Sequence, residues 1–413
     1  MSPSFVFLIL SFHAFFNCGT AVLYDPLITG VAPPHDKRGG HGGPTSPITV
    51  VDVRDFGAKG DGSWDDTQAF MKAWKKACSS STPAIFTVPK NKNYLVKPVV
   101  FSGPCKSTIT AQISGTIVAP KDQSIWGSNR YHWIRFDMVH NLKFEGGGTF
   151  NGNGHVWWSN SCKINKSLAL TFYKCNNLIV NNIRMINSQQ MHLEFMDCDI
   201  VTASNLIISA PGNSPNTDGI HVAGTKNIII SNSIIQTGDD CISIVTGSKN
   251  VRAENINCGP GHGISIGSLG QSNSEAEVSD VMVDNAVFTD TMNGVRIKTW
   301  QGGRGYVKNI AFQNILMRNS DHPIIIDQNY CDSNRPCHQQ KSAVAVSDVR
   351  YRNITGTSSA KFVLSFNCSV NVPCLDVTLR DINLVYTQGK AKTVFDNINW
   401  SQEGKIYPNP LTP

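Results

Sequence analysis

The sequence predicts an all-β protein, a right-handed parallel β-helix of roughly ten coils with one helix covering its N-terminal end. Three observations lead to this prediction. A motif of Asn or Asp followed by an aliphatic residue recurs along most of the chain, the segments that it opens are rich in Val and Ile with alternating positions, and one stretch has the periodicity of a helix. Because no such repeat can bury an apolar face alone, neighbouring repeats must stack into a solenoid.

The recurring motif sets the length of a repeat. Successive motifs from Asn177 onward are separated by 22 to 39 residues, within the range of solenoid repeats. A β-propeller is the alternative, but its blades need about 40–45 residues and antiparallel hairpins, and the shortest repeats here have 22 and 23 residues. Asn suits the corners of a coil because it tolerates left-handed backbone and can stack in ladders. The motifs begin at Asn141, Asn177, Asp199, Asn227, Asn250, Asp280, Asn309, Asp348 and Asp376.

One helix is expected at the start of the folded region. Asp65 or Asp66 can cap its N-terminus. A helix with a single apolar face is suited to cover the open end of a stacked architecture. The apolar face is formed by Ala69, Phe70, Ala73, Trp74 and Ala77.

The N-terminus predicts a signal peptide over residues 1–21. An apolar run over 5–16 is followed by small residues at 19–21, and the run is too short to span a bilayer. No Lys or Arg precedes the run, which departs from the usual pattern and leaves a buried N-terminal strand as the alternative. Residues 22–48 are expected to form a Pro/Gly-rich leader or linker, and residues 49–413 a single β-helix domain.

Composition limits the class of partner. The chain has 16% charged residues and a formal net charge of +6, without a dense run of Lys or Arg. Nucleic-acid binding is therefore not expected, whereas an acidic polymer is compatible with this charge. After the N-terminal run, the sequence contains no segment that approaches the length of a transmembrane helix, so membrane association is not expected.

Twelve cysteines support export to an oxidising compartment. Cys331 with Cys337 and Cys368 with Cys374 flank turns as two short closures; metal binding is the alternative, but the sequence has no C-x-x-C pair and no His at ligand spacing. Loss of Cys18 with the signal peptide leaves eleven cysteines, so at least one thiol should be unpaired. Sequons that are candidate glycan sites begin at Asn165, Asn353, Asn367 and Asn399.

Four short motifs in consecutive repeats carry the candidate chemistry. Asp218 and Asp240 are 22 residues apart, and His262 follows Asp240 by another 22, the length of one coil without an insertion. Residues one coil apart stack at about 4.8 Å, so Asp218, the adjacent pair Asp239 and Asp240, and His262 should lie along one face. The motifs are Asn216-Thr217-Asp218-Gly219, Gly238-Asp239-Asp240-Cys241, Gly261-His262-Gly263 and Arg296-Ile297-Lys298.

Two further features of these motifs bear on their geometry. Arg296 and Lys298 follow after one coil plus an insertion, and because they are two residues apart they should point to the same side of a strand. Asp239 and Asp240 cannot both face one cleft from a regular strand. A bend is therefore expected at this pair, which Gly238 permits.

Three carboxylates packed this closely should repel one another and raise at least one pKa, which gives a proton donor beside ionised partners. Hydrolysis of a glycosidic bond needs that combination, a protonated acid for the leaving oxygen and a carboxylate that activates water. Asx-turns are the alternative for any single Asp, and His262 alone could be a turn histidine. Arg296 and Lys298 could form a solvated face or balance the carboxylates, but beside such a cluster the favoured interpretation is binding of an acidic substrate.

In this order, the four motifs resemble the signature of the polygalacturonases, glycoside hydrolase family 28. The N-terminal stretch VRDFGAKGDGSWDDTQAFMKAWKKAC also resembles the plant members. The resemblance covers roughly residues 50–410, nearly all of the chain after the leader. It implies a right-handed parallel β-helix and hydrolysis of α-1,4-linked galacturonan by single displacement with inversion.

The resemblance also implies a role for each acidic residue of the motifs. Asp239 would be the general acid, and Asp218 and Asp240 would together hold and deprotonate the attacking water. His262 would assist by tuning the protonation of the acid, and Asn216 would orient the carboxylates or contact sugar. Inverting enzymes usually hold their carboxyl groups about 6.5–9.5 Å apart, whereas stacking on neighbouring coils suggests less, so inversion rests on the resemblance alone.

Substrate contacts and one disulfide follow from the same resemblance. Arg296 and Lys298 would bind the galacturonate carboxylate, and Tyr330 falls where the family has a substrate-contacting tyrosine. Cys241 and Cys258 resemble a disulfide pair beside the site. We expect a monomer that is secreted to the cell wall, acts on pectin or polygalacturonate, and needs no cofactor or metal.

Other classes of function fit parts of the pattern. A pectate lyase also combines a β-helix, an acidic cluster and a basic residue, but with bound Ca²⁺ and β-elimination. A non-catalytic pectin-binding or wall-structural protein would have lost a carboxylate or the His, and this sequence has lost none. A hydrolase of rhamnogalacturonan or xylogalacturonan is a closer alternative, against which Arg296 and Lys298 favour a carboxylate on the sugar at the cleavage site.

Overall fold

The computed structural model describes residues 47–127, 131–159, 168–333 and 337–410, which belong to one compact unit. The expected signal peptide and the leader up to residue 46 lie outside the described residues, as do Cys18, Cys162 and Asn165. No helix in the described part of the chain has the length and apolar character that a membrane span needs.

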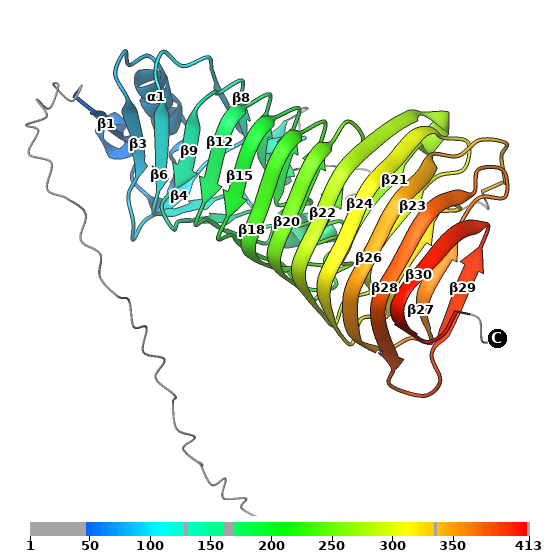
Figure 1. The fold of residues 1–413 in the computed structure, drawn as a ribbon. Coiled ribbons are helices and arrows are strands. Elements are labelled where there is room, and N and C mark those ends of the chain that lie inside the picture. The colour runs from blue at the N-terminus through cyan, green and yellow to red at the C-terminus, as the bar shows by residue number, and fades with distance from the viewer. Residues whose placement is uncertain (1–46, 128–130, 160–167, 334–336, 411–413) are drawn as a thin grey trace, which may run out of the picture. The chain divides into compact units, whose positions relative to one another are not determined.

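Eleven parallel strands form one sheet, here called sheet B, with one strand in each coil. Its order follows the sequence, so each coil stacks on the coil before it. In Figure 1 the coils run from the blue N-terminal end to the red C-terminal end. The strands are β5 (Val99–Ser102), β8 (His132–Asp137), β11 (Leu168–Tyr173), β14 (Leu193–Met196), β17 (Ile220–Ala223), β19 (Ile242–Ile244), β21 (Ile264–Leu269), β23 (Asn293–Thr299), β25 (His322–Asp327), β27 (Phe362–Asn367) and β29 (Lys392–Asp396).

The other strands form sheet A, which begins as two parallel rows and continues as one row of longer, bent strands. One row is β1 (Thr49–Asp52), β3 (Ala84–Val88), β6 (Ile109–Ile113), β9 (Leu142–Glu145), β12 (Asn176–Asn181) and β15 (Asp199–Ser204). The other is β2 (Asp61–Asp65), β4 (Asn93–Leu95), β7 (Thr116–Val118), β10 (Thr149–Asn151), β13 (Arg184–Ile186) and β16 (Ile207–Ser209). Both continue into β18 (Lys226–Gln236), β20 (Lys249–Cys258), β22 (Glu275–Thr289), β24 (Arg304–Arg318), β26 (Ala345–Ser358), β28 (Cys374–Tyr386) and β30 (Ile398–Tyr407).

Five helical segments complete the described structure. The expected helix is α1 (Thr67–Cys78), and the others are α2 (His155–Trp158) and the 3₁₀ turns η1 (Val53–Phe56), η2 (Gln123–Trp126) and η3 (Gln271–Asn273). The Asp65 carboxylate accepts hydrogen bonds from the Thr67 amide and hydroxyl at 3.0 and 2.5 Å, so Asp65 caps the first turn of α1. Asp66 instead holds the preceding loop through the amides of Lys59 and Gly60.

Side chains that point inward from each coil fill the core. A row of Phe rings stacks along the inside of sheet B at centroid distances of 5.0 to 5.8 Å, one ring from each coil. Trp74 of α1 packs edge-on against this row, 5.2 Å from Phe136, which closes the N-terminal end of the core as expected. The stacked rings are Phe101, Phe136, Phe172 and Phe195.

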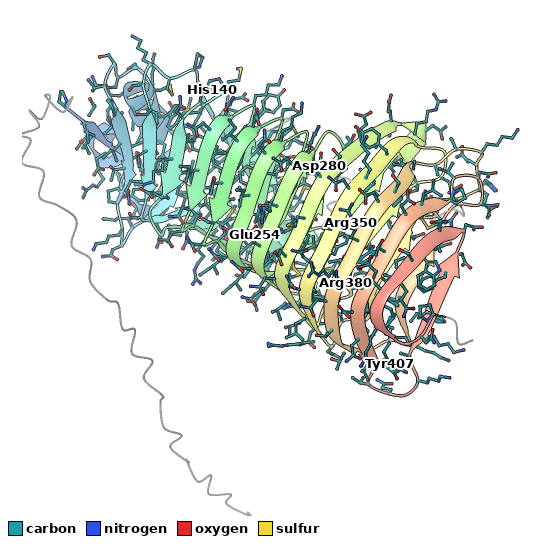
Figure 2. The ribbon with its side chains drawn as sticks, in the orientation of Figure 1. His140, Glu254, Asp280, Arg350, Arg380 and Tyr407 are labelled. Carbon is teal, nitrogen blue, oxygen red and sulfur yellow. A yellow bond between two sulfur atoms is a disulfide. The ribbon has the colours of Figure 1, made fainter. Side chains whose placement is uncertain are left out.

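Ladders of asparagine and aspartate run along the corners, as expected from the repeated motif. Asn250 donates to Asn227 at 2.7 Å and Asn227 donates to Asp199 at 2.8 Å, while Asn285 donates to Asn255 at 2.6 Å in a second ladder. Most of these corner residues have φ near +50 to +60°, the left-handed region that Asn tolerates. The outer face of the long strands carries surface ion pairs such as Arg350–Asp348 and Arg380–Glu403. Figure 2 labels the two arginines of these pairs.

One coil departs from the expected ladder. In the motif Asp199-Ile200 the left-handed corner is Ile200, with φ of 55°, and Asp199 precedes it. Ile200 lies opposite Asn227, and its side chain is 53% exposed. A β-branched residue is strained in this region, and the Asp199 carboxylate partly compensates because it accepts bonds from the Ile200 amide and from Asn227.

We predict that Ile200→Asn stabilises the protein by about 1 kcal/mol, because Asn adopts left-handed backbone at lower cost and can join the ladder. The midpoint of urea unfolding should rise. The matched control is Ile229→Asn, which replaces an exposed isoleucine on regular strand backbone and should give no increase. Equal midpoints for Ile200→Asn and the unmodified protein would show that this corner is not strained.

Candidate active site

The eight candidate residues line one cleft of about 520 Å³ on the outer side of sheet B. The carboxylates and His262 lie in the turns that lead from strands β16, β18 and β20 of sheet A into β17, β19 and β21, whereas Arg296 and Lys298 lie on β23 itself. The candidates that share this cleft are Asn216, Asp218, Asp239, Asp240, His262, Arg296, Lys298 and Tyr330.

The spacing of 22 residues corresponds to one coil, as the sequence indicates. Ile220, Ile242 and Ile264 are register partners on three neighbouring strands. Two residues earlier, the same register places Asp218, Asp240 and His262 in consecutive turns. Backbone hydrogen bonds join these turns, from the Gly219 amide to the Asp240 carbonyl at 2.9 Å and from the His262 amide to the Asp239 carbonyl at 2.7 Å.

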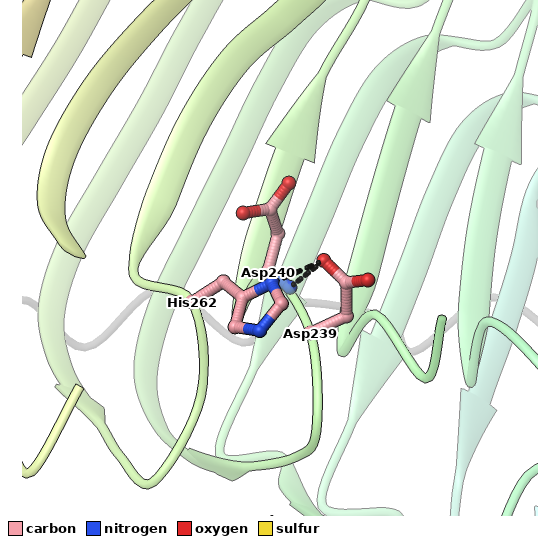
Figure 3. A group of neighbouring side chains, drawn as sticks. All are labelled: Asp239, Asp240 and His262. Atoms are coloured by element: carbon pink, nitrogen blue, oxygen red, sulfur yellow. Dashed lines mark hydrogen bonds and ion pairs between the residues drawn. The ribbon is translucent and has the colours of Figure 1, made fainter. Parts of the chain in front are cut away.

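The bend expected at Asp239 and Asp240 is present between β18 and β19. Gly238 allows it because a Cβ at this position would lie 1.9 Å from the Ser214 carbonyl oxygen, so only glycine fits. The Asp239 carboxylate accepts a hydrogen bond from the Asp240 amide at 2.7 Å, which stabilises the turn. Figure 3 shows that the two carboxylates leave the turn in different directions, with Asp239 against His262.

Asp240 is buried and surrounded by donors. Its carboxylate accepts from the Arg296 guanidinium and the Lys298 ammonium, both at 2.9 Å, and from the Ser265 hydroxyl at 2.7 Å. Burial alone would raise the pKa of Asp240, but the charges of Lys298 and Arg296 outweigh it and lower the pKa below its usual value. Asp240 is therefore ionised in the folded protein at neutral pH.

Asp218 has the opposite environment. It is 6% exposed, and the Ser243 hydroxyl contacts its carboxyl group at 2.7 Å. Burial, together with the neighbouring Asp239 and Asp240, raises the pKa of Asp218 well above its usual value. The expectation that one carboxyl pKa is raised is thus confirmed, but burial is the larger cause, and the affected group is Asp218 and not the expected proton donor Asp239.

Asp239 is the carboxylate most open to the cleft. Its side chain is 17% exposed, against 3% for Asp240. His262 Nδ1 lies 3.0 Å from Asp239 Oδ1, and the Asn216 amide lies 3.5 Å from Oδ2. A histidine in this position can exchange a proton with the carboxylate, and Asn216 helps to orient it.

Tyr330 forms one wall of the cleft beside the cations. Its ring packs edge-on against Trp300 at 5.4 Å, and the Lys298 ammonium lies 5.5 Å from the ring centroid. Burial raises the pKa of Tyr330, so the phenol stays protonated as a hydrogen-bond donor.

Comparison with known families identifies the chain. A model of glycosyl hydrolases family 28 matches residues 78–404. The chain belongs to this family. It is therefore a glycoside hydrolase, as the resemblance of the motifs indicates.

Curated relatives and solved structures agree with this assignment. Family 28 relatives include a polygalacturonase of Persea americana, 58% identical over 362 residues that cover 86% of this chain and 78% of the relative. Polygalacturonase-2 of Solanum lycopersicum is 54% identical over 370 residues, covering 88% and 81%. The predicted right-handed parallel β-helix is confirmed by the strand topology and by its similarity to two solved structures.

These two structures show the fold alone, because their sequences are distant. Endo-xylogalacturonan hydrolase from Aspergillus tubingensis superposes with a TM-score of 0.74 at 22% identity, covering 87% of this chain and 99% of that chain. The polygalacturonase from Erwinia carotovora ssp. carotovora superposes with a TM-score of 0.71 at 24% identity, covering 89% and 100%.

Three residues of this family 28 site were missed by the sequence reasoning although the same arithmetic would have found them. His221, Ser243 and Ser265 are separated by 22 residues each and are register partners on β17, β19 and β21. They form a second row on the outer face of sheet B, next to the row of carboxylates. Serine is common on strands that face solvent, so the residue type at these positions gives no signal of a functional role.

His192 was also missed, and its local sequence carries no signal that separates it from a core histidine. It is fully buried, and both its amide and its Nδ1 contact the Asp218 carbonyl, at 2.8 and 3.0 Å. The Ser188 amide donates to Nε2 at 3.3 Å, so Nδ1 carries the ring proton. Burial lowers the pKa of His192 to about 4, which keeps the ring neutral as a clamp on the Asp218 backbone.

The charge of the site bears on the calcium-dependent alternative. Asp239, Asp240 and His262 each offer one ligand atom within 4.8 Å of the others. Both oxygens of Asp240, however, already accept from the cations Arg296 and Lys298. A divalent ion placed there would face two fixed positive charges, so the residues do not suit a resident Ca²⁺.

Disulfides stabilise the region around the site and the N-terminal helix α1. The pair Cys241–Cys258, implied by the resemblance, is present beside the catalytic turn, and the two short closures Cys331–Cys337 and Cys368–Cys374 are present as well. A fourth pair, Cys78–Cys105, joins the end of α1 to the chain after β5. At least one unpaired thiol was expected, and the described residues contain two, because Cys175 and Cys198 are buried as free cysteines.

We predict that Asp218→Asn abolishes activity while stabilising the protein. The raised pKa means that the unfolded chain loses this proton at lower pH than the folded protein does, so Asp218 reduces stability as pH rises above about 4. Asn does not titrate, and its oxygen can accept from Ser243. The gain in thermal midpoint should therefore be larger at pH 7 than at pH 4, and equal gains at both would contradict the raised pKa.

Proposed function

We propose that this enzyme hydrolyses the α-1,4-galacturonosyl linkages of de-esterified pectin by general acid and base catalysis with inversion. The substrate class is supported by relatives at 58% and 54% identity that are polygalacturonases. The observation that carries the proposal is that Asp239 and Asp240 leave one turn into different environments. Asp239 opens to the cleft beside His262, and Asp240 is buried between two cations.

Asp239 suits the role of general acid. A proton donor must reach the oxygen that joins two sugars, and Asp239 is more exposed to the cleft than Asp240. His262 at 3.0 Å can supply a proton to Asp239 between turnovers. Asn216 holds the second oxygen of Asp239 and so orients the carboxyl group.

Asp218 and Asp240 are placed to bind and activate a small nucleophile such as water. Both line the cleft and are almost completely buried, which suits contact with a water molecule better than contact with a sugar ring. Direct attack by Asp240 on the sugar would break its bonds to Arg296, Lys298 and Ser265, which lower its nucleophilicity. Water activation, and hence inversion, is therefore favoured even though Asp239 and Asp240 have oxygens within 4.8 Å, closer than the usual inverting range of about 6.5–9.5 Å.

Arg296 and Lys298 suit recognition of a sugar carboxylate. Arg296 uses Nε for Ser265 and one Nη for Asp240, and Lys298 contacts Asp240 through Nζ. A guanidinium has five N–H donors and an ammonium has three, so both cations can serve a second acceptor. The two cations also form a positively charged wall of the cleft, which can attract the carboxylate of galacturonate.

The proposed place of action is the cell wall, reached by secretion, with the enzyme working as a monomer without a cofactor. Four disulfides support an oxidising compartment. Polygalacturonate is then the partner, and its negative charge complements the cationic wall of the cleft.

Product analysis on polygalacturonate tests the function. New reducing ends are expected, without unsaturated products that absorb ultraviolet light and without inhibition by a chelator. Proton NMR of the first products should show the β-anomer, since the bond cleaved is α. Unsaturated products would assign a lyase, and a first-formed α-anomer would make Asp240 or Asp218 a covalent nucleophile.

We predict that Asp239→Asn lowers kcat by at least about 100-fold, the range for loss of a positioned proton donor. The fold should persist, because the Asn side chain can still accept the Asp240 amide. The control Asp55→Asn, at an exposed position of η1, should leave kcat unchanged. Near-normal turnover by folded Asp239→Asn protein would refute the assignment of the acid.

A further inference from the structure

A row of polar side chains on the outer face of sheet B extends from the catalytic cleft toward the N-terminal end. Its members are register partners on consecutive strands, and most of them are almost completely buried although they face outward. The row consists of Thr171, Glu194, His221, Ser243, Ser265 and Arg296. Ser265 and Arg296 contact Asp240, and Ser243 contacts Asp218, but the presence of the other members in the row needs an explanation.

Ser243 connects Asp218 to His221. Its hydroxyl oxygen lies 2.7 Å from Asp218 Oδ2 and 2.7 Å from His221 Nδ1. A hydroxyl has one proton, so the two contacts must run in the same direction. When Asp218 is ionised, Ser243 donates to it and His221 Nδ1 donates to Ser243. When Asp218 is protonated, Asp218 donates to Ser243 and Ser243 donates to His221 Nδ1.

These two arrangements differ by the transfer of one proton along the row. We propose that Ser243 and His221 form a relay that removes from Asp218 the proton taken from the attacking water. The proton of Asp218 Oδ2 passes to Ser243 Oγ while the Ser243 proton passes to His221 Nδ1, which leaves a carboxylate, a neutral hydroxyl and an imidazolium. His221 then loses one proton to water in the cleft and returns, by proton exchange with water, to the neutral tautomer whose Nδ1 can accept again, so charge and atoms balance over the cycle.

The need for such a path follows from the surroundings of Asp218. Asp218 is 6% exposed and its burial favours the protonated form, so a proton captured there is held strongly. Asp240 cannot take it over easily, because Arg296 and Lys298 stabilise its ionised form. His221, in contrast, lines the cleft and is partly exposed.

Glu194 adds a second titratable group next to the relay. It is the register partner of His221 on β14, is 2% exposed, and accepts from the Thr171 hydroxyl at 3.0 Å. Burial raises the pKa of Glu194 to about 7, close to the range in which histidine titrates. When ionised it stabilises a positive charge on the neighbouring strand, which favours formation of the imidazolium.

The relay rests on the role of Asp218 in the proposed function, and chemical rescue tests it separately. We expect Ser243→Ala to lower kcat on polygalacturonate at least about tenfold with little change in KM, because chemistry and not binding is impaired. Ser243→Thr, which keeps a hydroxyl, should retain more of the kcat. His221→Ala should lose a similar factor, and added imidazole, which can enter the cleft, should restore its kcat in proportion to the imidazole concentration.

Ser265→Ala is the matched control. Ser265 is a buried serine on the next strand that donates to Asp240 at 2.7 Å, but its other partner is the Nε of Arg296, which does not titrate. Loss of this hydroxyl should reduce kcat without any response to imidazole. Circular dichroism and thermal midpoints identify variants that fail to fold. If Ser243→Ala does not fold, the kcat of His221→Ala and its response to imidazole still test the relay.

The outcomes separate the relay from the proposed function. Unchanged kcat in Ser243→Ala or in His221→Ala would overturn the relay, as would a loss in His221→Ala that imidazole does not restore. These results leave hydrolysis by the unmodified enzyme intact. If the unmodified enzyme does not hydrolyse polygalacturonate, the proposed function fails, and the relay falls with it.

Discussion

The parallel hydrogen-bond register between successive coils is the constraint on which the site depends. It places residues 22 positions apart on neighbouring strands, so Asp218, Asp240 and His262 meet without any long loop. The insertion between β21 and β23 does not disturb this arrangement, because Ser265 and Arg296 remain register partners across it. A loop can therefore change length between coils while the strands that carry the charges stay aligned.

Mutual repulsion alone would raise the pKa of each of the three carboxyl groups. The surroundings of each group make the pKa values of Asp218 and Asp240 differ. Asp240 is ionised because two cations that bind it directly outweigh its burial, whereas at Asp218 burial and the like charges of Asp239 and Asp240 outweigh the Ser243 hydroxyl and the charge of Lys298. The fold thus buries the carboxyl group of Asp218, whose ionised form is destabilised, and this burial reduces the stability of the protein at neutral pH. The asparagine ladders and the stacked Phe rings lie away from these carboxyl groups and provide the rigidity that holds them in place.

Much of this could be predicted from sequence because a solenoid converts sequence spacing into spatial distance. The period, the N-terminal helix α1, the corner asparagines and the clustered motifs all follow from local patterns, whereas the short helix α2 was not predicted. Ile200 shows where such reasoning ends, since the motif Asp199-Ile200 matches the others although the left-handed corner has shifted by one residue. The pKa of Asp218 was out of reach for a different reason, because it depends on burial and on which carboxylate the cations contact. Residue roles such as proton donation by Asp239 came from family resemblance, and spacing alone does not assign them.

The partners of the carboxylates show a direction along the β-helix. Asp218 is contacted by Ser243, 25 residues later, and Asp240 is contacted by Ser265, also 25 residues later. Asp239 is contacted by His262, 23 residues later. Each of these three contacts therefore comes from the coil that follows the acid, and Asp240 is also contacted by the cations Arg296 and Lys298 two coils ahead. Substitution of Ser243, one coil ahead, should therefore alter the pKa of Asp218, and substitution of Lys298 or Arg296, two coils ahead, should alter the pKa of Asp240, so the residues that set these two acidities are found by counting forward along sheet B.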